Sequence, residues 1–131
     1  MATKAWTSKA DLETWTWDGN EDTTSTPGDV TIAAGNTSTV GVSPAYEAAN
    51  WAAGYWRNLK IGGTVPAATA YYLRFRVGGT QVACESATYS EYINGADSGG
   101  DMYFNLAQWV LNNAAWNTGP WIMIEISLVS D

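Results

Sequence analysis

The sequence predicts an all-β protein, a two-sheet antiparallel β-sandwich with one or two short helical turns. First, residues 121–129 alternate strictly, placing Ile122, Ile124 and Ile126 on one face of an extended strand. Second, short alternating segments recur between glycine- and asparagine-rich turns. Third, no long segment has helical periodicity, which disfavours alternating strand–helix units. A jelly roll is the most economical topology, with an immunoglobulin-type sandwich as the competitor.

The length of 131 residues predicts a single domain, residues 11–131. A polar N-terminal arm, residues 1–10, precedes it. The first predicted strand spans 12–17 and is followed by a polar turn. Two short strands, 29–34 and 37–43, flank Gly35-Asn36 in a hairpin-like connection. Ser43 as N-cap and Pro44 at the first helical position predict a short helical turn that begins there and ends near Asn50.

The second half of the chain contains the strands with the strongest apolar alternation. In order, we expect strands at 55–61 and 71–77, a tight turn at 78–79 leading into 81–84, a polar excursion over 85–100, a strand from 102 to about 109, a second helical turn or loop over 110–119, and the final strand at 121–129. The final strand should lie in the middle of one sheet.

The apolar positions of these strands define the expected core. They are Leu12, Ile32, Val40, Val42, Leu59, Ile61, Leu73, Phe75, Val77, Val82, Met102, Phe104, Leu106, Ile122, Ile124, Ile126 and Leu128.

The net charge of the chain disfavours some classes of binding partner. Six Lys and Arg face thirteen Asp and Glu, a net charge of -7. This balance disfavours nucleic acid and anionic membranes, which both need clustered cations. Residues 1–8 lack the apolar segment of a signal peptide, and no segment is long enough to span a membrane, so we expect synthesis in a cytoplasm without export. A processed fragment of a secreted protein is the alternative.

Catalysis is not expected, and neither is a cofactor. The sequence has no His, which removes the commonest general base, and the lone Cys84 reads as a small core residue. Glu125 reads as an outward carboxylate without an obvious partner. The closest approach to a metal motif is Asp18, Asn20 and Asp22, but Thr23 stands where a calcium loop needs Gly, so a solvated acidic turn is the preferred interpretation.

The eight Trp and seven Tyr exceed what a core of this size needs. Several lie beside amide or guanidinium groups, an arrangement that suits sugar binding, because a ring takes the C–H face and the amides take the hydroxyls. The candidate glycan-binding residues are Trp51, Trp56, Arg57, Trp109, Asn112 and Trp116.

The preferred interpretation of the surplus aromatics is an interface between subunits. The candidate interface residues are Trp6, Trp15, Trp17, Trp121 and Met123. An apolar patch of this kind predicts a homo-oligomer, trimer first and dimer second.

The acidic, Thr-, Gly- and Ala-rich β pattern, the start at Met1 and the closing strand 121–129 resemble the small jelly-roll proteins that decorate phage capsids or form phage fibres and tails. The resemblance covers the whole chain as architecture and composition, without a shared motif. It implies a non-enzymatic virion component that contacts other virion subunits through the arm and an exposed aromatic face. A carbohydrate-binding module or receptor-binding domain is the alternative, since it shares the sandwich.

Overall fold

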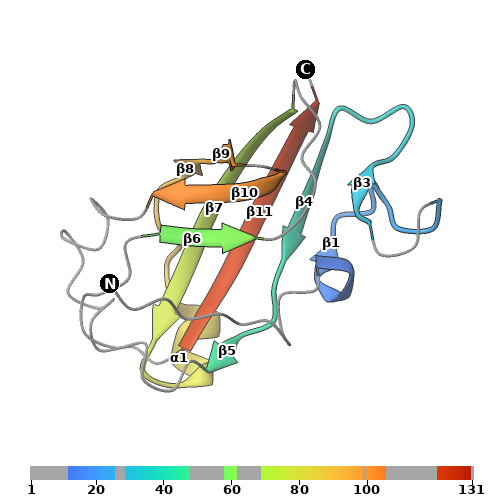
Figure 1. Ribbon diagram of the computed structural model, residues 1–131. Coiled ribbons are helices and arrows are strands. Elements are labelled where there is room, and N and C mark those ends of the chain that lie inside the picture. The colour runs from blue at the N-terminus through green and yellow to red at the C-terminus, as the bar shows by residue number, and fades with distance from the viewer. Residues whose placement is uncertain are drawn as a thin grey trace.

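The computed structural model describes residues 12–25, 29–47, 58–61, 69–98, 100–105 and 121–130. Within these ranges the protein is mostly β, with antiparallel sheets and one short α-helix (Figure 1). The N-terminal arm and the second helical turn at 110–119 lie outside the described residues, as does Leu106.

The elements follow one another along the chain as a series of short strands and two long ones. They are the 3-10 helix η1 (Leu12–Thr14), β1 (Thr16–Trp17), β2 (Glu21–Asp22), β3 (Thr31–Ile32), β4 (Ser38–Val42), β5 (Tyr46–Glu47), β6 (Asn58–Ile61), β7 (Thr69–Gly78), α1 (Gln81–Ser86), β8 (Ile93–Asn94), β9 (Ala96–Ser98), β10 (Asp101–Asn105) and β11 (Trp121–Ser130).

β11 is the central strand, as the sequence predicts. The main sheet has the order β1-β4-β11-β7-β8, and β5 pairs with the start of β11. All ten residues of β11 pair antiparallel with β7, from Trp121 opposite Gly78 to Ser130 opposite Thr69. β11 therefore joins the two halves of the sheet.

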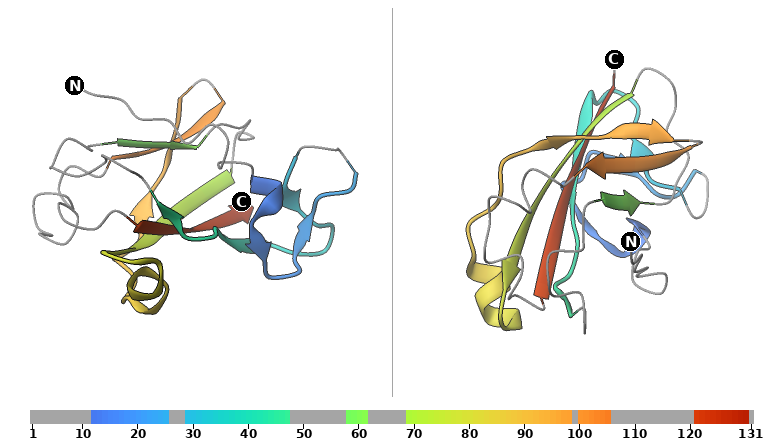
Figure 2. Two further views of the ribbon diagram at one scale, coloured as in Figure 1. Left: turned by 90° about the horizontal axis from the view of Figure 1, so that it is seen from below. Right: turned by 60° about the vertical axis from the view of Figure 1, so that its left-hand side comes forward.

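A second sheet, β6-β10-β9, runs across one face of the main sheet (Figures 1 and 2). Its buried residues, for example Leu59 and Phe104, meet a layer in which Ile122, Ile124 and Ile126 of β11 stand opposite Val77, Phe75 and Leu73 of β7. This face of the main sheet is here called the core face. The expectation that the two central strands, β7 and β11, contribute to the core is confirmed.

Helix α1 packs on the opposite face of the main sheet, here called the second face (Figure 2). Thr80 caps the helix by accepting a hydrogen bond from the Ala83 N–H. A Cβ on Gly78 would lie 2.4 Å from the Cys84 backbone nitrogen, so the helix reaches the strand only because residue 78 has no side chain. The expected strand at 81–84 is thus wrong, and Val82 is 75% exposed rather than in the core.

The predicted strand over 12–17 is also corrected. Residues 12–14 form η1, and only Thr16 and Trp17 pair with β4. Trp15 is 5% exposed and its indole Nε1 donates to the Tyr46 hydroxyl at 3.0 Å, so its ring lies in the core. An aromatic residue with a polar group can be buried at little energetic cost when that group has a hydrogen-bond partner.

Val40 and Val42 do not reach the core. Both are half-buried and stand beside Ser127 and Glu125 of β11 on the second face. Residue 41 takes the core side, where a Cβ would lie 2.7 Å from the ring of Trp17. The bulky ring excludes a side chain at this position, and the alternation of β4 follows from it.

The helical turn expected at Ser43 is absent from the described part, because β5 begins at Tyr46. Ser43 instead continues the ladder: its N–H donates to the Ile124 carbonyl and its Oγ accepts from the Ile124 N–H, both at 2.8 Å. The hydroxyl thereby takes the place of a backbone acceptor just before Pro44.

The hairpin expected around Gly35-Asn36 differs as well. β3 pairs with β2, and β4 pairs with β1 and β11. The turn itself forms, with the Asn36 N–H donating to the Ala33 carbonyl at 3.1 Å and Gly35 at positive φ. Ile32 lies in this small two-stranded sheet, outside the core cluster.

Candidate functional site

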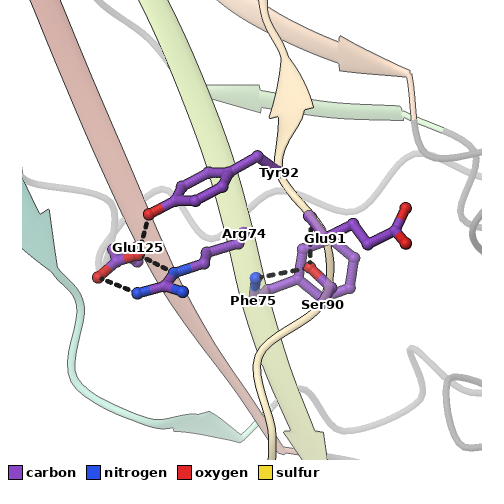
Figure 3. Close-up of polar contacts among 6 residues, drawn as sticks. All are labelled: Arg74, Phe75, Ser90, Glu91, Tyr92 and Glu125. Atoms are coloured by element: carbon purple, nitrogen blue, oxygen red, sulfur yellow. Dashed lines mark hydrogen bonds and ion pairs between the residues drawn. The ribbon is translucent and has the colours of Figure 1, made fainter.

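An ion pair lies at the centre of the second face. Glu125 of β11 and Arg74 of β7 are directly opposite in register, and the guanidinium binds the carboxylate through two nitrogens, Nε to Oε2 and Nη2 to Oε1, the latter at 3.1 Å (Figure 3). Glu125 is 7% exposed. The hydrogen bonds that Arg74 donates to Glu125 raise the pKa of Arg74 above its usual value.

Two tyrosines from the segment after α1 lie against this pair. The guanidinium carbon of Arg74 is 4.1 Å from the ring centroid of Tyr89 and 4.9 Å from that of Tyr92. Arg76, the next arginine on the same face of β7, lies 3.8 Å from the ring of Tyr89. Arginine and aromatic side chains thus alternate, which fixes the segment 89–92 on the sheet.

Tyr92 extends across β7 towards β11. Its hydroxyl donates to Oε2 of Glu125 at 3.4 Å, while its ring lies over Arg74 (Figure 3). Ser90 anchors the same segment from behind, because its N–H donates to the Phe75 carbonyl and its Oγ accepts from the Phe75 N–H. Tyr92 nevertheless stays 53% exposed.

The sequence gives no sign of this cluster except that Arg74 and Glu125 both point away from the core. The expectation that Glu125 points away from the core is confirmed, but the expectation that it has no partner is wrong. A single strand pattern assigns a face to each residue but not the partner strand. The register of β7 with β11 and the return of residues 89–92 over the sheet, which together form the cluster, are non-local.

The second face has two further parts on the β4 side. Val40, Val42 and Val129, here called the valine patch, are half-buried neighbours on β4 and β11. An open pocket of about 470 Å³ lies next to Val42, between the main sheet and α1. Met123 of β11 and the α1 residues Gln81 and Glu85 form part of its wall. Gln81 holds the Glu85 carboxylate by a hydrogen bond of 3.0 Å.

The acidic turn uses its carboxylates to hold the chain. Asp18 accepts hydrogen bonds from the Thr39 hydroxyl at 2.8 Å and from the backbone N–H of Asn20 and Val40. Burial by itself raises the pKa of Asp18, but these hydrogen bonds together lower it below its usual value. Asp22 likewise accepts from Ser25 and Thr24, and these bonds lower its pKa.

The described residues contain no group of three His, Cys, Asp or Glu side chains placed to hold a metal ion. Cys84 is fully buried on the inner side of α1, as expected of a core cysteine, and burial raises the pKa of its thiol. Among the described helices none has the length and apolarity needed to cross a membrane.

The predicted site residues are placed only in part. All six candidate glycan-binding residues, and Trp6, lie outside the described residues. Of the interface candidates, Trp15 is in the core, and Trp17 packs against the core with its Nε1 bound to the Leu12 carbonyl at 2.8 Å. Trp121 and Met123 lie half-buried on the second face, at the end where α1 packs.

Comparison with models of protein families, with curated proteins and with solved structures finds no match for this chain.

Proposed function

We propose that this chain is a non-enzymatic virion structural subunit, a capsid-decoration or fibre component with a jelly-roll fold, that assembles through the second face of its main sheet. The observation that carries the proposal is the valine patch. Val40, Val42 and Val129 are apolar, half-buried and on the same face of the paired strands β4 and β11. Apolar side chains gathered in this way on a sheet face favour a partner surface.

The engagement of the polar groups supports a structural role. Glu125 has both carboxylate oxygens bound by Arg74, Asp18 accepts hydrogen bonds from Asn20 and from β4, and Asp22 accepts hydrogen bonds within its own turn. A general acid or base must be able to exchange its proton with a substrate. These carboxylates are engaged in contacts within the protein instead.

Assembly as a homo-oligomer, trimer first and dimer second, follows from the same surface, because identical subunits favour closed symmetry. Subunits of net charge -7 repel one another, so association should strengthen when salt screens the charge. Contacts with other virion subunits would add the N-terminal arm and Trp6. The alternative, a carbohydrate-binding or receptor-binding module using Trp51, Trp56, Trp109 or Trp116, stays a prediction from the sequence.

Light scattering after size-exclusion chromatography tests the assembly surface. We expect an oligomer whose population rises with salt, and a shift towards monomer in Val40→Glu and Val129→Glu. Val82→Glu is the matched control, because this valine is exposed on α1, away from the patch. A wild-type monomer at all concentrations and salts, or equal effects of all three substitutions, contradicts the proposal.

Co-sedimentation with particles from the native source tests the virion assignment. The purified chain should bind at a fixed copy number, and a variant lacking residues 1–10 should keep its melting temperature while losing occupancy. Full occupancy by the truncated chain would exclude the arm, and no binding by either form would exclude the virion role.

A further inference from the structure

The part of the second face on the β7–β8 side has a composition unlike the valine patch. Across the sheet, Asn94 of β8 stands directly opposite Tyr72 of β7, which stands opposite Ser127 of β11. Tyr92 is two residues before Asn94 and lies over Arg74, the next row of the same face. Two aromatic rings, an amide and a hydroxyl therefore share one surface.

The ion pair at the centre of this surface is electrically balanced. The charge of Arg74 is offset by Glu125 through a two-point contact, so neither sign is left over at the centre. Figure 3 shows the neighbouring Glu91 pointing away from the pair. An anionic ligand would have to compete with Glu125 for Arg74, and a cationic ligand would meet the guanidinium beneath the ring.

Tyr92 is both held and open. Its hydroxyl is fixed by Glu125 and one face of its ring by Arg74, yet more than half of the residue is exposed. The ion pair beneath the ring is partly buried, and it contributes little net stability because the desolvation of the two groups offsets their attraction. A ring that is already ordered loses little conformational entropy when a ligand stacks on it, so the arrangement favours binding.

We propose that Tyr92, Asn94 and Tyr72 form a binding site for the ring of a neutral sugar. The outer face of Tyr92 takes the C–H face of a pyranose, and the Asn94 amide and the Tyr72 hydroxyl take its hydroxyls. Residues 92 and 94 are about 7 Å apart along the strand, a span that one pyranose with its hydroxyls covers. The site lies on the same face as the valine patch, and Ser127 of β11 stands between Tyr72 of the site and Val40 of the patch.

The net charge of the protein favours a neutral ligand, and the side chains of the site favour a polar one. The net charge of -7 disfavours anionic polymers, and the only guanidinium in contact with the Tyr92 ring, among the described contacts, is paired. A hydrophobic peptide would leave the Asn94 amide without hydrogen bonds, at an energetic cost. A hydroxyl-rich ring with one apolar face satisfies both the ring and the amide.

The test is saturation-transfer NMR and titration calorimetry with the methyl glycosides of glucose, galactose, mannose and N-acetylglucosamine, each at about 10 mM because single-ring sites bind weakly. We expect at least one to bind the full-length chain. Tyr92→Ala should weaken it about tenfold, while Tyr92→Phe, which keeps the ring, should retain most of the affinity. Asn94→Ala should weaken it severalfold.

Tyr103→Ala is the matched control, because Tyr103 is 37% exposed on β10 of the other sheet, and it should leave binding unchanged. Melting curves of all variants separate loss of binding from loss of fold. Binding of none of the four glycosides overturns the proposal. So does binding that survives Tyr92→Ala, or binding confined to sulfated or sialylated glycans on an array. The assembly experiments remain independent, since the Tyr92 and Asn94 variants should keep the oligomeric state.

Discussion

The two faces of the β7–β11 pair use the same backbone in opposite ways. On the core face, Ile124 opposite Phe75 and Ile126 opposite Leu73 form a closed apolar layer under the second sheet. On the second face, the residues between them bring Glu125 opposite Arg74, with tyrosines laid across the pair. The core face supplies stability through burial, whereas the second face holds a fixed geometry at little net gain. A measured stability map should therefore be strongly asymmetric.

The largest expected effect is on the core face. Ile124→Asp places an unpaired charge in the closed layer and should cost more than about 5 kcal/mol, comparable with the stability of a small domain. Circular dichroism should show an unfolded or insoluble chain. Ser127→Asp, on the same strand but the second face, should fold with a small loss. A soluble Ile124→Asp protein with near-native melting would falsify the core assignment.

The ion pair sharpens the comparison. Arg74→Met leaves the Glu125 carboxylate buried without its partner and should cost about 3 kcal/mol in denaturant unfolding. Arg74→Met combined with Glu125→Leu removes both charges and should return to within about 1 kcal/mol of the wild type. Equal losses in the single and double variants would mean that the pair itself stabilises the fold, against the contrast drawn between the faces.

Helix α1 depends on close approach to the second face. Gly78→Ala would drive a Cβ into the backbone at Ala83 and Cys84, and should cost about 2 kcal/mol. Gly79→Ala is the control, because nothing lies within 4 Å of a Cβ there, and it should be close to neutral. Faster labelling of Cys84 by a thiol reagent in Gly78→Ala alone would show that the helix has lifted. Similar unfolding curves and labelling rates for the two variants would place the helix farther from the strand.

The smallest expected effect is at the edge beyond β4. The lowered pKa of Asp18 means that its ionised form stabilises the fold above the unfolded-state value of about 3.9 and that this contribution is lost as pH falls through the folded-state value. The difference in unfolding free energy between the wild type and Asp18→Asn should therefore be present at pH 7 and shrink with acidification. A difference independent of pH would assign the effect to packing.

The part of the fold that the sequence predicts correctly is the part in which apolar and other residues alternate along a strand. The pattern of Ile122, Ile124 and Ile126 predicts a strand with one buried face, and its high apolarity places it centrally, which the structure confirms. Cys84 was likewise expected to be buried. Residues 81–86 were misread because Gly78-Gly79 resembles a hairpin turn, whereas Thr80 acts as a helix cap.

The ion pair could not be predicted, because it depends on register between strands 51 residues apart in sequence. Val40 and Val42 were assigned to the wrong face for a related reason. Their alternation was visible, but its phase is set by the ring of Trp17 over residue 41, a tertiary contact. The proposed sugar site depends on the pairing of β8 with β7 and on the return of Tyr92 over Arg74, which are also non-local, so it has no signal of its own in the sequence.

The position of β11 has a consequence for strand exchange between molecules. Among the described strands, β4 and β7 are joined only through β11, so withdrawing residues 121–130 leaves two strand edges without this partner. Such edges accept an extended segment from another chain. A chain ending before Trp121 should therefore be rescued by a synthetic peptide of residues 121–130, and at high concentration intact subunits can trade this strand with one another.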